Sequence, residues 1–274
     1  MSASISTSTL PERRASPRAL GNLVLVLRAY RGGLVFGELV GGDPPAVVLL
    51  HGWRRSHQDF AALARGLQAR GVSSLALDLP GFGASPPPTV ATGAAGYADT
   101  VATLLRELGG APSVLVGHSF GGRVATVLAA TYPELVSHVV LTGVPLLRTG
   151  TGAKSPLAYR LLRRGARWKV VSPARLEKAR QRYGSADYRA ASGVMRDVLV
   201  TVVNEEYSAY LSTLRVGLDL VWGGKDTVVS PDVARRAQQL VPGSRLQVVE
   251  GVSHLLPSEA PDSLLEPLVK VLGA

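Results

Sequence analysis

The sequence G-H-S-F-G, Gly117–Gly121, constrains this chain more than any other stretch. An apolar run that predicts a short strand, Val114–Val116, precedes it, and small helix-forming residues follow it up to Ala130. A serine flanked by glycines between a strand and a helix predicts a sharp turn that exposes the hydroxyl above the edge of a sheet. The two glycines leave room for the neighbouring backbone and tolerate the dihedral angles of such a turn. Ser119 is therefore the candidate nucleophile.

The bulk composition excludes several classes of protein. The chain has 274 residues, of which 46% are hydrophobic, enough for one large α/β domain with an insertion or for two small domains. It contains no cysteine, which excludes a disulfide framework, a thiolate metal site and a cysteine nucleophile. No apolar run approaches the roughly 20 residues of a membrane span. Residues 1–21 contain no hydrophobic segment of a secretory signal, so we expect a disordered leader and a cytoplasmic location.

Apolar runs alternate with helical stripes along most of the chain. The predicted strands are a hairpin within Tyr30–Val40, Ala46–Leu50, Val72–Leu77, the strand before Ser119, His138–Val144, Leu218–Trp222 and Leu246–Val249. The predicted helices are Phe60–Ala69, Thr100–Leu108, the helix after Ser119, Pro231–Leu240 capped by Ser230, and Pro261–Leu272. This order predicts an α/β fold with a mostly parallel central sheet flanked by helices. In such folds ligands bind beyond the carboxyl ends of the strands.

The alternation stops between residues 148 and 212. Helices are predicted there at Ser155–Val171, from the Ser172-Pro173 cap to Gly184, and at Tyr188–Asn204. We therefore predict that residues 22–274 form one domain in which residues 148–212 are an inserted helical cap. Residues 148–196 contain 13 lysines and arginines and two acidic residues, a net charge of +11 against +10 for the whole chain.

A serine hydroxyl is a weak nucleophile until a base accepts its proton, and the base needs an acid to orient it. In a sheet of this kind the order along the chain is serine, acid, histidine. His254 lies in the loop after the last predicted strand, and Asp226 lies in the glycine-rich turn after the preceding strand. They are the candidate base and acid. The rival acids are Asp219, inside a strand, and Asp232, in a first helical turn, where carboxylates are favoured in any case.

The remaining titratable residues near these motifs are given structural interpretations. Four other histidines are interpreted as packing or surface residues: His51, His57, His118 and His138. Asp78, in the sequence D-L-P-G-F-G, is interpreted as a carboxylate that accepts hydrogen bonds from nearby N–H groups and fixes its loop.

Acyl transfer also requires hydrogen-bond donors for the oxyanion that forms on the carbonyl oxygen. The backbone N–H of Phe120, directly after the serine, is one candidate, and that of Trp53, in the loop after an early strand, is the other. Because main-chain atoms are the donors, the side chains of Trp53 and Phe120 are free to line the pocket.

Together these motifs resemble the α/β-hydrolase superfamily. The segments that carry the resemblance are His51-Gly52-Trp53, Asp78–Ser85, Gly117–Gly122, Gly223–Asp226 and Gly251–His254, within Leu23–Ala274. The resemblance implies a serine hydrolase with no metal and no cofactor. Similar members include carboxylesterases, lactonases, non-metal haloperoxidases and C–C bond hydrolases, whereas epoxide and dehalogenating enzymes carry aspartate in place of the serine. We expect cleavage of a small carboxylic ester or related acyl substrate through an acyl-enzyme.

Three alternatives stay open. One is a non-catalytic or receptor-like protein with a hydrolase fold, which does not explain why the serine, acid and histidine positions are all filled. The sequence G-x-S-x-G-G-R also resembles the menaquinone-pathway lyases of the superfamily, in which the arginine holds a substrate carboxylate. That resemblance implies a substrate-binding role for Arg123 in a C–C bond hydrolase or lyase; otherwise Arg123 pairs with a local acid or reaches the surface.

The basic segment, residues 148–196, either binds an anionic membrane surface, attracts an anionic substrate, or faces solvent. Few aromatic residues are interleaved with its charges, so we expect no nucleic-acid partner.

Overall fold

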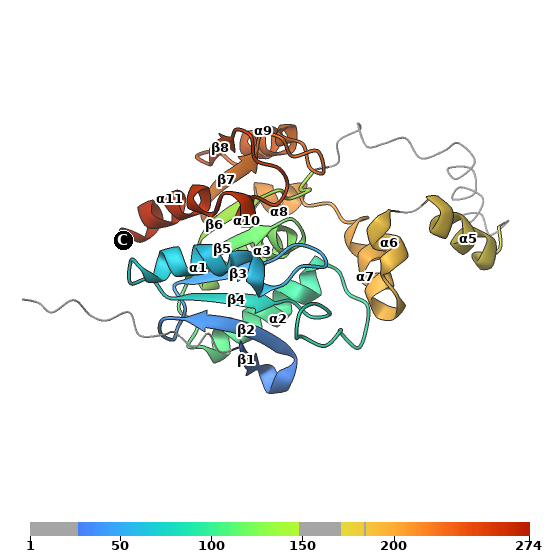
Figure 1. Ribbon diagram of the computed structural model, residues 1–274, viewed down its shortest axis with the longest axis horizontal. Helices are drawn as coiled ribbons and strands as arrows, with labels where there is room; N and C mark the ends of the chain where they lie inside the picture. The colour runs from blue at the N-terminus through green and yellow to red at the C-terminus, as the bar shows by residue number, and fades with distance from the viewer. Residues whose placement is uncertain (1–26, 148–170, 184) are drawn as a thin grey trace, which may run out of the picture.

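A computed structural model describes residues 27–147, 171–183 and 185–274 and contains an eight-stranded sheet (Figure 1). The strands are β1 (Leu27–Tyr30), β2 (Val35–Val40), β3 (Val47–Leu50), β4 (Ser74–Asp78), β5 (Ser113–His118), β6 (Val136–Thr142), β7 (Gly217–Gly223) and β8 (Arg245–Val249). Their order across the sheet is β1-β2-β4-β3-β5-β6-β7-β8. The β1–β2 and β2–β4 pairs are antiparallel and the other pairs are parallel. The predicted α/β fold with a mostly parallel sheet is confirmed.

Helices cover both faces of this sheet. On one face pack α2 (Ala94–Glu107), α3 (Phe120–Thr131) and α9 (Pro231–Leu240), and on the other α1 (Ala61–Gln68) and α11 (Pro261–Leu272). The short helix α10 (Leu256–Glu259) directly precedes α11. Within the described ranges, every helix is too short or too polar to span a lipid bilayer.

The central strands are apolar along their length because both of their faces are covered. In β3, Val48 and Leu50 belong to the core on the α2–α3 side, whereas Val47 and Leu49 belong to the core on the α1–α11 side. Successive side chains of a strand point to opposite faces, so a strand buried on both sides needs a continuous apolar run. The sequence pattern thus predicted these strands for the correct physical reason.

Two predicted helices differ from the structure. Helix α2 begins at Ala94 rather than at Thr100, because Glu205, far along the chain, accepts a hydrogen bond from the Ala94 N–H (3.1 Å) and stabilises the earlier start. The predicted single helix Tyr188–Asn204 is wrong. The chain is extended at Ala191 (ψ 144°) and Gly193 has a positive φ of +51°, which divides it into α6 (Ala186–Ala190) and α7 (Gly193–Val202).

Helices fill the described chain between β6 and β7, where no strand occurs. They are α5 (Pro173–Tyr183), α6, α7 and α8 (Ser208–Ser212), and α5 begins at the predicted Ser172-Pro173 cap. Figure 1 shows α6 and α7 beside loops at one end of the sheet, and α5 farther out. The predicted helix Ser155–Val171 lies, apart from its last residue, outside the described residues. So do seven of the 13 basic residues of the segment, and a cap spanning residues 148–212 stays a prediction.

Asp219 lies near the amino end of β7, at the opposite end of that strand from Asp226. Its buried carboxylate accepts hydrogen bonds from His138 Nε2 (2.9 Å) and from Arg245 Nε (2.5 Å) and Nη2 (2.6 Å). Burial alone would raise the pKa of Asp219, but the hydrogen bonds from His138 and Arg245 outweigh it and lower that pKa to about 2. The carboxylate of Asp219 in β7 therefore links β6 and β8 to its own strand by hydrogen bonds.

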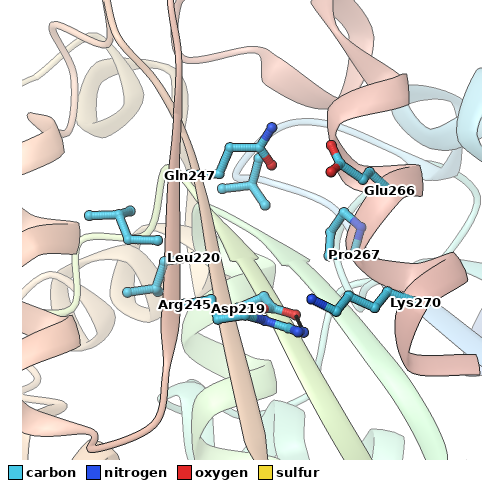
Figure 2. Close-up of a pocket in the computed structure, with 9 residues that line it drawn as sticks. Asp219, Leu220, Arg245, Gln247, Glu266, Pro267 and Lys270 are labelled. Atoms are coloured by element: carbon cyan, nitrogen blue, oxygen red, sulfur yellow. Dashed lines mark hydrogen bonds and ion pairs between the residues drawn. The ribbon is translucent and has the colours of Figure 1, made fainter.

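A groove of about 340 Å³ lies next to this cluster, between β8 and α11. Figure 2 shows the Asp219 and Arg245 side chains lying against each other, with Lys270 of α11 nearby. The described residues that line the groove include no serine, threonine or histidine. Because Asp219 links β7 to both neighbouring strands by hydrogen bonds, we assign this cluster a stabilising role.

We predict that Asp219→Asn lowers the free energy of unfolding at neutral pH by about 2 kcal/mol, because a pKa lowered from 3.8 to about 2 corresponds to that amount. A carboxyl whose pKa is lowered by folding contributes stability above its unfolded pKa. That contribution is lost as the pH falls through about 2, so wild type and variant should converge there. Urea unfolding at both pH values measures the difference.

The control for this measurement is Asp232→Asn. The Asp232 side chain is 71% exposed in its ion pair with Arg235, so its loss should change the free energy of unfolding by no more than about 0.5 kcal/mol. Equal stability of wild type and Asp219→Asn at neutral pH would contradict the assignment.

Candidate active site

Ser119 occupies the sharp turn between β5 and α3. Its backbone has φ +49° and ψ −108°, a conformation that costs a non-glycine residue about 1–3 kcal/mol. Added Cβ atoms show why glycines flank it: at Gly117 one would lie 2.5 Å from the Gly122 Cα, and at Gly121 one would overlap the Leu50 carbonyl oxygen. The predicted strand-to-helix turn with a strained serine is present.

His254 and Asp226 are brought together at the carboxyl end of the sheet. His254 Nδ1 lies 2.8 Å from Asp226 Oδ2, and the other oxygen, Oδ1, accepts hydrogen bonds from the N–H groups of Val228 (2.9 Å) and Val229 (2.8 Å). The Asp226 side chain is only 1% exposed. Because a carboxylate only accepts, it holds the proton of a neutral His254 on Nδ1, which leaves Nε2 as the free acceptor.

A glycine at the end of β6 makes room for this pair. A Cβ at Gly143, whose φ is +61°, would lie 2.9 Å from His254 Cε1 and 3.4 Å from Asp226 Oδ2. In the described chain the Ser119 hydroxyl and His254 are not hydrogen-bonded to each other, and such bonds between nucleophile and base often tighten only when substrate binds.

The two candidate oxyanion donors lie on adjacent segments. The Gly121 N–H donates to the His51 carbonyl (2.9 Å), which ties the turn at Ser119 to the loop that carries Trp53. The backbone N–H groups of Trp53 and Phe120 donate no hydrogen bond among the described residues. Phe120 begins α3, and the first N–H groups of a helix have no partner within it. Both donors are thus available to an oxyanion, and that role stays a prediction.

A cavity of about 200 Å³ opens beside Ser119. Its walls are mostly apolar and come from five parts of the chain. The lining residues are Trp53, Ser119, Phe120, Arg123, Pro145, Asp187, Leu199, Val202, Val203, Val228 and Val229. The Trp53 ring lies 5.4 Å from the Phe120 ring, edge to face, so the side chains of both candidate donors line the cavity as expected.

Arg123 lines this cavity, but its guanidinium is already engaged. Nη1 donates to the Val202 carbonyl (2.6 Å), and Cζ lies 5.4 Å from the centroid of the Tyr207 ring. Burial lowers the pKa of Arg123 from its ordinary value. The sequence allows two structural alternatives for Arg123, an ion pair with a local acid and a position at the surface. The observed contacts match neither of them.

The structural interpretation of Asp78 agrees with its contacts. Its carboxylate accepts hydrogen bonds from the N–H groups of His57 (2.7 Å) and Ala84 (2.9 Å), so it fixes its loop as predicted. His51 also has a structural role: its Nε2 accepts from the Leu79 N–H (3.0 Å) and its Nδ1 lies 2.7 Å from the Gly52 carbonyl.

His118 has a contact that the sequence interpretation missed. Its Nε2 lies 2.9 Å from the backbone carbonyl of His254, and the two rings are 4.9 Å apart. Burial, with the charge of His254 adding to it, lowers the pKa of His118 to about 4, so His118 is neutral at physiological pH. A carbonyl only accepts, so Nε2 carries the proton. The partners are 136 residues apart, and no local pattern indicates the contact.

Comparison with known proteins identifies the family. A model of the alpha/beta hydrolase family matches residues 47–266, which is most of the chain. The chain belongs to the alpha/beta hydrolase family. This α/β hydrolase is 27% identical over 260 residues to sn-1-specific diacylglycerol lipase ABHD11 of Mus musculus, covering 86% of this chain and 84% of that protein.

A second relative and a solved structure agree with this family and fold. The α/β hydrolase is 26% identical over 251 residues to 2-(acetamidomethylene)succinate hydrolase of Mesorhizobium japonicum, covering 85% of this chain and 90% of the relative. A bromoperoxidase structure from Bacillus anthracis superposes with a TM-score of 0.68 at 20% identity over 88% of this chain and 95% of that one, which shows the same fold. The family model and the two relatives named as a lipase and a hydrolase identify the chain as a hydrolase.

We predict that His118→Leu lowers kcat for hydrolysis about tenfold or more with little change in KM, because the His254 backbone loses the donor that positions it, and a displacement of about 1 Å costs up to about 100-fold in rate. His118→Gln, whose side-chain amide retains a donor, should recover most of the rate. Steady-state kinetics measures both variants, and thermal unfolding shows whether they fold. Wild-type kcat in a folded His118→Leu protein would contradict a role for this hydrogen bond.

Proposed function

We propose that this α/β hydrolase cleaves a small carboxylic ester through an acyl-enzyme, with Ser119 as nucleophile, His254 as base and Asp226 as orienting acid. The observation that carries the proposal is the 2.8 Å contact between His254 Nδ1 and the buried Asp226, at the same end of the sheet as a serine held at φ +49°. Three residues from separate loops in this arrangement support nucleophilic catalysis.

The reaction has two stages. His254 Nε2 accepts the proton of Ser119 Oγ as the oxygen attacks the ester carbonyl carbon, and Asp226 stabilises the imidazolium. The N–H groups of Trp53 and Phe120 bind the oxyanion. The ester C–O bond then breaks and His254 protonates the leaving alcohol. In the second stage His254 Nε2 accepts a proton from water as the water oxygen attacks the acyl carbon. The bond between that carbon and Ser119 Oγ breaks, His254 returns the proton to Oγ, and the carboxylic acid leaves.

The size of the cavity supports binding of the acyl group of the substrate there, and it limits the length of that group. Its volume is about 200 Å³, and the walls carry side chains such as Leu199 and Val229. Each methylene buried there contributes about 0.8 kcal/mol, so kcat/KM should rise about fourfold per carbon until the cavity is full. The lipase relative, whose name specifies diacylglycerol, supports an ester substrate.

The alternatives have less support. A carboxylate-bearing substrate depends on Arg123, whose guanidinium contacts Val202 and Tyr207, although the name of the Mesorhizobium japonicum hydrolase specifies a succinate derivative. Binding of the basic segment to an anionic surface or substrate depends largely on residues 148–170, which lie outside the described residues.

We predict that Ser119→Ala abolishes hydrolysis of a p-nitrophenyl ester and labelling by a fluorophosphonate, because both reactions require the serine oxygen. Circular dichroism should show an unchanged fold, and removing the hydroxyl leaves the glycines of the turn in place. Gel fluorescence of the labelled protein measures the second effect. Persistent labelling of Ser119→Ala would falsify the assignment of the nucleophile.

We predict that Asp226→Asn lowers kcat by a factor on the order of 10⁴, because an amide donates where the carboxylate accepts and so favours the wrong tautomer of His254. Asp219→Asn and Asp232→Asn, the rival acids, are the matched controls and should retain turnover under conditions in which they are folded. Steady-state kinetics on the three variants decides the matter. A crippled Asp232→Asn with an active Asp226→Asn would show that the acid lies elsewhere.

A further inference from the structure

We propose that Arg123, Tyr207 and Glu205 form a clamp that holds one wall of the cavity beside Ser119 and so determines which acyl groups it admits. The specificity part of this proposal rests on the proposed ester hydrolysis. The mechanical part, that the clamp holds the end of α7, does not. The clamp consists of these three residues and the helix ends that they join.

The first end of the clamp holds the carboxyl terminus of α7. Arg123 Nη1 donates to the carbonyl of Val202, the last residue of α7, at 2.6 Å. The last carbonyls of a helix have no partner within it, and a cation there is favoured by the helix dipole. Arg123 lies one turn beyond Ser119 in α3. The bond therefore ties α7 to the helix that begins at the candidate nucleophile.

The second end of the clamp holds the amino terminus of α2. Glu205 Oε2 accepts a hydrogen bond from the N–H of Ala94, the first residue of α2, at 3.1 Å. The N-cap residue of α2 is Gly93, which has no side chain to make that bond, and a Cβ there would overlap Glu205 Oε1. A carboxylate in this position satisfies a free N–H and is favoured by the helix dipole.

Tyr207 joins the two ends. Its hydroxyl donates to Glu205 Oε2 at 2.6 Å, and its ring lies 5.4 Å from Arg123 Cζ. The Tyr207 side chain is buried, and burial raises its pKa, so it remains a neutral donor. A buried charge that loses its compensation is costly. Each end of the clamp therefore depends on the other, and changes at the two ends should not be additive.

The clamp determines where the cavity wall stands. Val202 and the following Val203 line the cavity, so the bond from Arg123 to the Val202 carbonyl holds that wall in place. Tyr207 and Glu205 are not among the described residues that line it. Both can be changed without altering a lining side chain, which separates a positioning role from direct contact with the substrate.

A rival explanation is that Arg123 binds a carboxylate of the substrate. Its Nε is buried and has no partner among the described residues, so a donor remains for such a group. In that case Arg123 alone should matter, and only for carboxylate-bearing esters. In the clamp, Glu205 and Tyr207 matter as well, and neutral esters are affected.

The test uses the full chain with Arg123→Met, Tyr207→Phe and Glu205→Gln. Glu134→Gln is the control, since Glu134 makes an exposed ion pair with Arg106. The first measurement is hydrogen exchange of the backbone amides of residues 193–203, which needs no substrate. We expect each clamp variant to exchange at least about tenfold faster there and the control to match wild type. Arg123→Met and Tyr207→Phe each lose a hydrogen bond that involves a charged group, and Glu205→Gln replaces a charged acceptor with a weaker neutral one.

The second measurement is the ratio of kcat/KM for p-nitrophenyl octanoate to that for the acetate. A released wall should admit the longer chain, so we expect the ratio to rise about tenfold in all three variants, the effect of burying about two more methylene groups. The double variant Arg123→Met/Glu205→Gln should add little to either single change. Arg123→Lys replaces Arg123→Met if the latter does not fold, because it keeps the charge and loses the geometry.

Each outcome decides between the proposals. Unchanged exchange in all three variants overturns the clamp, and faster exchange with an unchanged ratio overturns its role in specificity. An effect confined to the arginine variant and to hydrolysis of a succinate half-ester replaces the clamp with carboxylate binding. If wild type hydrolyses no ester and is not labelled by a fluorophosphonate, the proposed function fails, and hydrogen exchange still tests the clamp.

Discussion

The backbone of Ser119 is in a conformation that a serine does not adopt unaided, and the centre of the structure is arranged to hold it there. The turn lies between β5, buried along its length, and α3, which packs on the core. Two backbone hydrogen bonds fix it, from the Ser119 N–H to the Thr142 carbonyl (3.0 Å) and from the Gly121 N–H to the His51 carbonyl (2.9 Å). Neighbouring strands on both sides thus hold a strain of about 1–3 kcal/mol.

The two ends of the sheet differ in their residues and in the roles that we assign to them. The strands that carry the candidate site are parallel, so the loops after β3, β5, β7 and β8 meet at one end, where Trp53, Ser119, Asp226 and His254 lie. At the other end of β7, the Asp219 carboxylate accepts hydrogen bonds from His138 of β6 and Arg245 of β8. Substitutions at Asp219 should therefore change the stability of the fold, whereas substitutions at the other end of the sheet should change the chemistry of the candidate site.

The segment between β6 and β7 completes the cavity from outside the sheet. Tyr188, Ala191 and Leu199 of that segment form an apolar cluster against Trp53, while Val202 and Val203 form a wall beside Ser119. This wall of the cavity thus comes from a different part of the chain from Ser119, Asp226 and His254. Such an arrangement allows selectivity to vary while the geometry of His254 and its acid partner stays the same.

The sequence by itself determined the features that a local pattern encodes. Continuous apolar runs predict strands covered on both faces, the Ser230 cap predicts where α9 begins, and glycines on either side of Ser119 predict its turn. The order of serine, acid and histidine then selected Asp226 and His254, which the fold brings within 2.8 Å.

Tertiary structure decided whatever depends on residues far apart. The start of α2 depends on Glu205, 111 residues away, and the contact of His118 with the His254 carbonyl joins residues 136 apart. The guanidinium of Arg123 is directed by the end of a helix 79 residues further on. A buried charge or ring nitrogen needs a hydrogen-bond partner, and tertiary packing determines which residue lies close enough to be that partner. The periodicity of the sequence contains no information about it.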